Sequence, residues 1–274
     1  MPVTERRTMQ EEVKANRDAW GLLSREHYEH YKKLLMDGAH ALNPIIRREL
    51  GDIAGKRVIH LQCNTGADTI ALARAGAIVT GVDLVPANIE YARRLADDLG
   101  QRNVSFFESD LMSPHDTLEE SDNYDIVFTS EGVICWLPDL AIWGKTIRRL
   151  LRPAGFFYVF DSHPFMMAMD ERKLGDGVLE IKYPYFKRPA DADDEIGGYA
   201  SPAKNAANYS WMYTMGDIVN ALSGAGLDIL FLNEHDRLFH DLGGMSLDGA
   251  NLFYYEHLRE KFPMSFSLKA KPRN

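Results

Sequence analysis

The chain has 274 residues, 45% of them hydrophobic, and a formal net charge of −9 at pH 7. That length and apolar content suffice for one α/β domain with additions. The acidic balance argues against a nucleic-acid partner, because nucleic-acid-binding domains usually carry a basic face. No run reaches the ~20 apolar residues of a membrane span, and residues 1–10 lack the apolar core of a secretory signal. We therefore expect neither nucleic acid nor a membrane as a partner.

Cysteine usage points to a reducing compartment. The two cysteines, Cys63 and Cys135, form no C-x-x-C pair and no metal-ligand spacing. This pattern suits the cytoplasm, and we expect no metal site. Cys63 lies in a predicted ligand-binding turn, where a buried, inert thiol is expected rather than a nucleophile.

The N-terminal region predicts a helical cap over residues 1–50. Residues 11–36 place apolar and aromatic side chains at helical intervals and predict a single helix. A short helix follows over residues 43–50, opened by an Asn-Pro pair. We expect this cap to precede a larger domain over residues 51–274.

The most informative segment is residues 57–83, whose pattern is strand, turn, helix and strand. The apolar run from Val58 to Leu61 is typical of a parallel strand buried on both faces. The turn ends on Gly66, and the second strand ends on Asp83. An acid at the tip of that strand can hold the two hydroxyls of a ribose. The segment therefore predicts a nucleoside site.

The turn between that first strand and the helix indicates which nucleoside is bound. Dinucleotide-binding loops use G-x-G-x-x-G, because glycines let the backbone approach a pyrophosphate. Here Gln62 and Asn64 occupy two of the turn positions, and only Gly66 remains glycine. The Gln62 side chain would lie where a pyrophosphate must sit, whereas Asn64 tolerates the left-handed conformation. The turn therefore favours S-adenosylmethionine, whose zwitterionic methionine end can meet amide side chains.

Strands and helices alternate through much of the remaining chain. Strand-like runs follow at residues 104–111, 124–130, 155–162, 227–232 and 265–270, with a turn over 152–155. Helices are predicted over residues 86–100, 138–150 and 215–225. Five alternations of strand and helix predict a parallel sheet covered on both faces.

Two stretches break this alternation. Residues 163–208 contain four prolines and an acidic run, and residues 233–263 contain several aromatic and histidine residues. Both stretches are too long for plain connections. We expect them to be insertions that cap the carboxyl edge of the sheet.

Taken in order, these landmarks resemble the class I S-adenosylmethionine-dependent methyltransferases, in particular the small-molecule group described as type 11 or type 25 domains. The resemblance covers about residues 10–270. It implies an α/β fold with a Rossmann-like, doubly wound seven-stranded sheet, mostly parallel with an antiparallel last strand, plus N-terminal helices and cap insertions. The family more often has an acid where His60 stands and glycines where Gln62 and Asn64 stand.

The resemblance also implies a cofactor site built from successive strand tips. The residues expected to contact the cofactor are His60, Gln62, Asn64 and Gly66 at the methionine part, Asp83 with Leu84 at the ribose, Asp110 with Leu111 at the adenine edge, and Ser130 with Glu131 beneath the sulfonium. Tyr28, on the predicted N-terminal helix, is interpreted as placing its hydroxyl near the methionine carboxylate. The alternative is that it belongs to an aromatic patch that packs the helix onto the sheet.

Methyl transfer needs few catalytic groups, because the sulfonium supplies the driving force and the protein mainly aligns the nucleophile with the methyl carbon. His163 directly follows the strand over 155–162 and is the first candidate for a general base. The alternative for His163 is a cap on the turn that follows it. His240 is a second candidate base. Glu131 is a candidate for orienting an acceptor amine or the cofactor ammonium, or else a polar residue at a strand end.

These observations predict a methyltransferase that passes a methyl group to an oxygen, nitrogen or sulfur atom of a small molecule by in-line displacement. The cofactor would be S-adenosylmethionine and its product S-adenosylhomocysteine, and a homodimer is one assembly that we consider. An NAD-dependent oxidoreductase is an alternative, against which Gln62 and Asn64 count. A non-catalytic adenosyl-ligand binding protein is another alternative, and nothing in the sequence excludes it.

Overall fold

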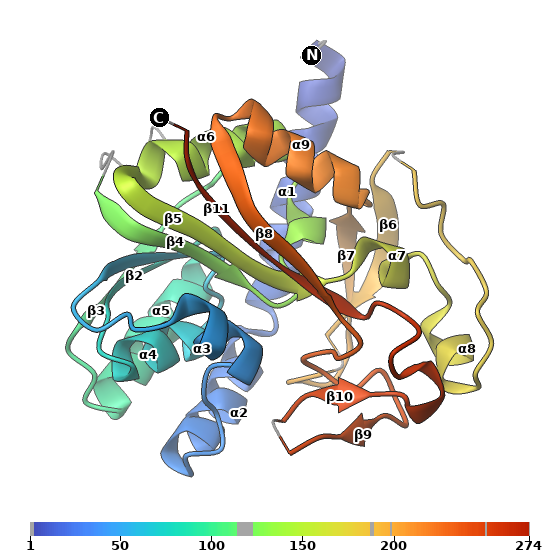
Figure 1. Cartoon of the computed structure of the whole chain (residues 1–274), viewed down its shortest axis with the longest axis horizontal. Coiled ribbons are helices and arrows are strands. Elements are labelled where there is room, and N and C mark those ends of the chain that lie inside the picture. The colour runs from blue at the N-terminus through green and yellow to red at the C-terminus, as the bar shows by residue number, and fades with distance from the viewer. Residues whose placement is uncertain (1–2, 114–122, 187–188, 198, 250, 274) are drawn as a thin grey trace.

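A seven-stranded sheet forms the centre of the molecule, with helices on both of its faces (Figure 1). The computed structural model describes residues 3–113, 123–186, 189–197, 199–249 and 251–273. In spatial order the sheet strands are β3 (Val104–Glu108), β2 (Ile78–Asp83), β1 (Arg57–Leu61), β4 (Tyr124–Ser130), β5 (Leu151–Ser162), β11 (Ser265–Pro272) and β8 (Leu227–His235). The strands from β3 to β5 pair in parallel, whereas β11 runs antiparallel to both β5 and β8. The predicted fold class is confirmed.

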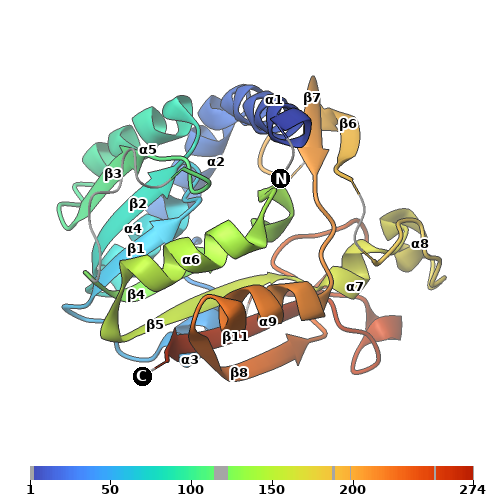
Figure 2. The same ribbon diagram turned by 90° about the horizontal axis from the view of Figure 1, so that it is seen from above.

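Helices bury the two faces of this sheet (Figure 2). Within the described residues the helices are α1 (Val3–Gly21), α2 (Ser24–Met36), α3 (Pro44–Leu50), α4 (Ala67–Arg74), α5 (Pro86–Asp98), α6 (Leu140–Leu150), α7 (Pro164–Met167), α8 (Glu171–Gly175) and α9 (Met215–Gly224), with 3₁₀ turns η2 (Ile134–Trp136) and η3 (Glu256–Leu258). On the α6–α9 face, Trp143 packs edge-on against Phe157, with ring centroids 5.3 Å apart. On the α3–α4 face, Ile46 and Leu72 share one buried cluster with Phe128. None of the helices in the described ranges has the length and apolar character of a membrane span.

The predicted N-terminal helix over residues 11–36 is in fact two helices, and this prediction was wrong. The chain breaks between α1 and α2, where Ser24 donates a 2.6 Å hydrogen bond to Asn88 at the start of α5. The break lets α1 pack on the first insertion while α2 packs on α5. Periodicity alone did not reveal it, because the apolar spacing continues through both helices.

The predicted turn over residues 152–155 is also wrong, because this segment lies inside β5. The pairing of β4 with β5 shifts its register between Tyr124 and Ile126, opposite this segment. A Cβ atom on Gly155 would stand 2.8 Å from the Tyr124 carbonyl oxygen. The Pro and Gly residues therefore mark an irregularity in a strand rather than its start.

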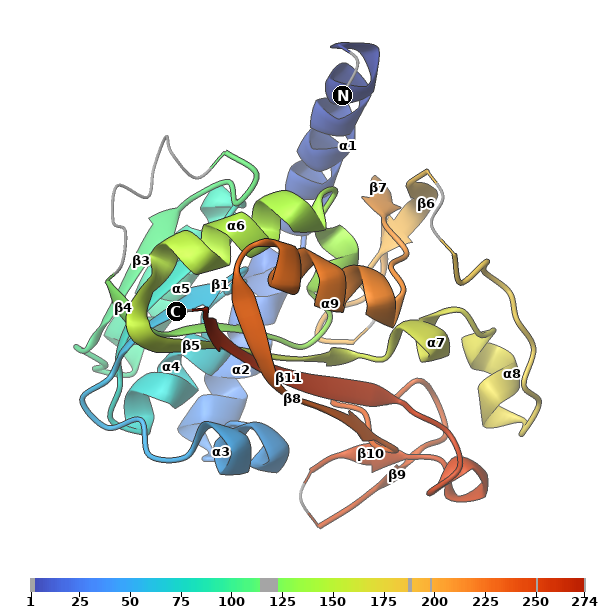
Figure 3. The same cartoon turned by 45° about the horizontal axis from the view of Figure 1, so that its top comes forward.

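Both insertions lie at the same end of the sheet (Figure 3). The first carries α7, α8 and the hairpin of β6 (Asp191–Ile196) with β7 (Lys204–Ser210), and the second carries the short hairpin of β9 (Ser246–Leu247) with β10 (Phe253–Tyr254). The Asn16 side chain of α1 exchanges two 2.7 Å hydrogen bonds with the backbone of Tyr209. Lys204 donates to Glu26 of α2 at 2.7 Å. Hydrogen bonds therefore hold the N-terminal helices against the first insertion.

Candidate active site

A cavity of about 640 Å³ lies beyond the carboxyl ends of β1, β2, β3 and β4. Open α/β sheets bind their ligands at this edge, and this volume is within the range of small-molecule sites. The predicted residues that line the cavity are His60, Gln62, Asn64, Asp83, Leu84, Asp110, Leu111, Ser130, Glu131 and His240. The structure therefore brings most of the predicted site residues to one cavity.

The turn after β1 has an unusual backbone for its residue types. Gln62 and Asn64 adopt φ angles of 56° and 49°, a left-handed region that non-glycine residues rarely occupy. The Gln62 side chain donates to the Val133 carbonyl at 3.0 Å, while its Oε1 atom is buried with no hydrogen-bond partner among the described residues. Gly66, at φ 83°, ends the turn and precedes α4. Gly66 does not line the cavity, so its part is to shape the turn.

Asp83 at the tip of β2 is a carboxylate of the cavity wall that three hydrogen-bond donors hold in place. It accepts hydrogen bonds from the backbone of Asn64 at 2.8 Å and of Val85 at 3.0 Å, and from the Asn88 side chain at 3.1 Å. Burial raises the pKa of Asp83, and these three donors oppose that rise. The donors fix the carboxylate at the cavity wall, and its oxygens have acceptor capacity beyond these three bonds.

Asp110 and Leu111 follow β3 and complete this side of the cavity. The Asp110 carboxylate accepts from the backbone of Met112 at 2.8 Å. The backbone N–H of Ser109 donates to the Asp83 carbonyl at 2.9 Å, which holds the tips of β3 and β2 together. Leu111 is buried and offers an apolar surface beside the Asp110 carboxylate.

A second pair of carboxylates lies near the tip of β4, Asp68 from α4 and Glu131 from the residue after β4. Asp68 accepts from the Ser130 hydroxyl at 2.8 Å and pairs with the His40 ring at 3.0 Å. Burial raises the pKa of Asp68, but these two partners outweigh it, so the pKa is lowered overall. Glu131 adopts φ 61°, and among the described residues its carboxylate has only the Asn43 side chain within hydrogen-bond range, at 3.5 Å. Burial and the nearby Asp68 carboxylate raise the pKa of Glu131 well above its usual value.

Aromatic rings from three separate segments line the same cavity as Glu131. Tyr31 comes from α2, Tyr199 from the first insertion, and Phe239 with His240 from the second insertion. Tyr199 and His240 have ring centroids 6.4 Å apart, and those of Phe239 and His240 are 4.8 Å apart. Burial lowers the pKa of His240 to about 4, so this ring is neutral at pH 7. The part of the cavity beyond β4 is therefore aromatic and acidic.

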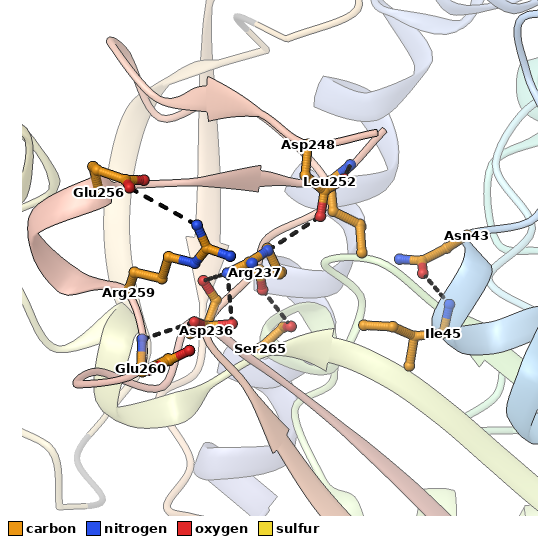
Figure 4. Close-up of polar contacts among 10 residues, drawn as sticks. All are labelled: Asn43, Ile45, Asp236, Arg237, Asp248, Leu252, Glu256, Arg259, Glu260 and Ser265. Atoms are coloured by element: carbon orange, nitrogen blue, oxygen red, sulfur yellow. Dashed lines mark hydrogen bonds and ion pairs between the residues drawn. The ribbon is translucent and has the colours of Figure 1, made fainter. Parts of the chain in front are cut away.

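An ion-pair network anchors the segment that carries Phe239 and His240 (Figure 4). The Arg237 guanidinium pairs with Asp236 at 2.7 Å and with Asp248 at 3.1 Å. Its backbone carbonyl accepts from the Ser265 hydroxyl at the start of β11. These contacts tie the second insertion to the sheet immediately before the two ring residues.

The geometry does not support two of the predicted roles. Both ring nitrogens of His163 are occupied, because Nε2 donates to Glu234 at 2.8 Å and Nδ1 accepts from the Phe165 backbone at 3.1 Å. His163 is not among the cavity-lining residues and caps α7, which was the alternative reading. Tyr28 is also away from the cavity, with its ring buried and its hydroxyl bonded to Asp98. Tyr31, one turn further along α2, lines the cavity instead.

His60 lines the cavity and is 3% exposed. Its Nδ1 atom is 2.9 Å from the Thr69 hydroxyl, and its Nε2 atom has no hydrogen-bond partner among the described residues. Burial lowers the pKa of His60 to about 4. Among the described residues, no group of three or more His, Cys, Asp or Glu side chains is arranged to hold a metal ion.

Sequence reasoning did not assign a role to Asp68, His40, Tyr31 and Tyr199, which line the cavity, or to Asp161, which does not line it but holds the turn after β4. Asp161, at the tip of β5, accepts hydrogen bonds from the backbone of Gly132, Val133 and Ile134, at 2.7 to 3.1 Å. Its position at the end of an apolar strand was a usable signal, since Asp83 was identified in that way. The other four residues lie on helices and loops, where no local pattern marks them.

Known proteins share sequence with this part of the chain. Residues 59–157 match the protein family described as a methyltransferase domain. The chain is 28% identical over 129 residues to a ubiquinone biosynthesis O-methyltransferase from Actinobacillus pleuropneumoniae, covering 43% of this chain and 53% of that protein. It is 31% identical over 133 residues to a fatty-acid O-methyltransferase from Mycolicibacterium smegmatis, covering 47% and 46%. The chain thus spans about half the length of the curated relatives it matches.

A solved structure shares the fold over most of the chain. An S-adenosylmethionine-dependent methyltransferase from Mesorhizobium loti superposes with a TM-score of 0.54 at 20% identity, covering 83% of this chain and 96% of that one. The sheet order agrees with that fold, the cavity lies at its strand tips, and the match to a methyltransferase domain covers residues 59–157. The family match ends at residue 157, before both insertions begin.

Proposed function

We propose that this protein transfers a methyl group from S-adenosylmethionine to a small-molecule acceptor. The observation that carries the proposal is the joint placement of Asp83, Gln62 and Asp110 in the wall of one cavity at the strand tips. A ribose, a methionine end and an adenine edge each require a different polar contact, and three neighbouring strand tips supply them.

The residues fit the cofactor. The Asp83 carboxylate is held by protein donors and faces the cavity, where it would accept from the ribose hydroxyls. The unpartnered Oε1 atom of Gln62 is an acceptor suited to the methionine ammonium group. Asp110 with Leu111 would bind the adenine edge, and Ser130 with Glu131 would lie beneath the sulfonium. His60, Asn64 and Leu84 would complete the site.

The chain's own contribution to the chemistry is alignment and exclusion of water. When bound, S-adenosylmethionine supplies the methyl carbon, and the electrons of the breaking C–S bond remain on sulfur in S-adenosylhomocysteine. Residues of the two insertions, of α1 and of α2 line the cavity, so they would hold the acceptor in line. His240, neutral at pH 7, is the remaining candidate base.

The domain division, the location and the assembly are proposed on the same basis. We take residues 1–50 as a cap on a domain over 51–274, because α1 and α2 pack beside the cavity. The two separate cysteines and the net charge of −9 support a cytoplasmic enzyme that acts without metal, nucleic acid or membrane. A homodimer is the assembly to test first.

Calorimetry and product detection test the proposal. S-adenosylmethionine and S-adenosylhomocysteine should bind in the micromolar range, and NAD should not bind. Comparable NAD binding would favour the oxidoreductase. Methyl transfer from labelled cofactor into a metabolite extract should then be detectable. Tight cofactor binding without transfer to any extract would favour a non-catalytic adenosyl-ligand binding protein.

A further inference from the structure

The charge of the cavity wall is strongly one-sided. Among the described residues that line it, eight are acidic: Asp68, Asp83, Asp110, Glu131, Glu171, Asp191, Asp193 and Glu195. The basic ones are Arg17, whose guanidinium is already paired with Glu108 at 2.9 Å, and three histidines. Burial holds two of these histidines, His60 and His240, neutral at pH 7. A carboxylate or phosphate acceptor would find little positive charge here to balance it.

The acidic side chains meet aromatic rings at one place, beside Glu131. Burial raises the pKa of the Tyr31 and Tyr199 hydroxyls, and the Glu131 carboxylate raises both pKa values further. The Phe239 ring approaches Gly132, the residue after Glu131, within 3.8 Å of where a Cβ atom would stand. Aromatic rings combined with carboxylates recognise ammonium groups, because the ring faces and the carboxylates both attract positive charge.

Two observations besides the acidic cluster indicate a ligand at this place. His60 is 3% exposed and lines the cavity, and its Nε2 atom has no partner among the described residues. The second is the buried Glu131 carboxylate, whose pKa is raised well above its usual value by burial and by the nearby Asp68 carboxylate. A buried carboxylate with one long hydrogen bond is poorly satisfied by the protein alone. A bound cation would satisfy it.

We propose that the methyl acceptor carries a positively charged nitrogen group, which binds within reach of Glu131, Tyr31 and Tyr199. This inference rests on the proposed function, since it concerns the acceptor side of the same cavity. The match to the methyltransferase domain covers residues 59–157, whereas Tyr31, Tyr199 and both insertions lie outside that range.

The test uses two probes of matched shape and different charge. Choline carries a trimethylammonium group, and 3,3-dimethyl-1-butanol replaces its nitrogen by carbon. Each is titrated by calorimetry into the full-length protein after saturation with S-adenosylhomocysteine, so that the nucleoside side is filled. Choline should bind at least about tenfold more tightly than the neutral alcohol.

Matched variants assign the preference to the named residues. Glu131→Gln and Tyr199→Leu should each reduce the choline preference by about tenfold. Glu234→Gln makes the same chemical change on β8, away from the cavity wall, and should leave the preference for choline intact.

Equal binding of the two probes, tighter binding of the alcohol, or no choline binding at tens of millimolar would overturn the inference. If S-adenosylhomocysteine itself does not bind, the proposed methyltransferase function is wrong. If it binds but choline is not preferred, only the inference about a positively charged acceptor is wrong.

Discussion

The backbone N–H of Asn64 donates a 2.8 Å hydrogen bond to the Asp83 carboxylate, which joins the turn after β1 to the tip of β2. Asn64 sits at φ 49°, so this bond holds a backbone conformation that the residue would not favour by itself. The same carboxylate lines the cavity. One side chain therefore shapes the turn and presents an acceptor to the ligand.

Replacing Asp83 by alanine should remove detectable S-adenosylhomocysteine binding. The ribose loses a charged acceptor, worth about 1.5–3 kcal/mol, and the turn loses the bond that holds Asn64. Calorimetry at a temperature where circular dichroism shows a folded protein measures the affinity. Asp125→Ala is the control, because this buried carboxylate lies at the opposite end of the sheet and bonds the Arg57 backbone at 2.9 Å. It should lower stability but not affinity, and unchanged affinity in Asp83→Ala would remove the ribose assignment.

Replacing Gly66 by alanine should destabilise the domain through a steric contact as well as through backbone strain. A Cβ atom there would lie 2.9 Å from the Phe106 ring, at φ 83°. Gly100 also has a positive φ, 63°, but nothing lies within 4 Å of its Cβ position. Urea unfolding should show a loss of about 1 kcal/mol for Gly100→Ala and about 1–3 kcal/mol more for Gly66→Ala. Equal losses of unfolding free energy in the two variants would mean that the Phe106 ring moves aside without an energetic cost.

His163→Ala should lower stability without changing turnover. The side chain caps α7 and bonds Glu234, so its loss should cost about 1 kcal/mol. Methyl transfer measured well below the unfolding temperature should match the unmodified protein. A large fall in kcat with normal cofactor affinity would restore His163 as a base.

Stability should fall as the pH drops below about 6.5. Burial lowers the pKa of His60 from 6.5 to about 4, so the unfolded chain binds a proton in this window that the folded chain does not. The stability associated with the neutral His60 ring is fully present above pH 6.5 and is lost progressively as the pH falls towards 4. Between pH 7 and pH 5 His60 alone should account for about 2 kcal/mol. Urea unfolding of His60→Gln should show a shallower pH dependence, and an unchanged dependence would contradict this prediction.

Much of the fold could be predicted because its signals are local. The apolar runs of β1 and β4, the proline that begins α5 and the acid that ends β2 are each visible within a few residues. Asp83 and Asp110 were identified from strand ends, and the parallel topology then places both at one edge of the sheet. Both residues do line the same cavity.

The acceptor side could not be predicted, because its contacts are between distant segments. Tyr31 and Tyr199 come from separate segments of the chain, and no spacing rule relates them. Tyr28 and Tyr31 share a helix, and only the packing of α2 against α5 decides which of them reaches the cavity. His163 failed as a base for a similar reason, since Glu234 on another strand occupies its ring nitrogen.

A crystal structure with S-adenosylhomocysteine would show where the nucleoside lies. We expect ribose hydroxyls on the Asp83 carboxylate, the adenine beside Leu111, and the sulfur atom pointing towards Glu131. A nucleoside bound outside this cavity, or one inside it that leaves the Asp83 carboxylate without contact, would rule out the proposed cofactor site.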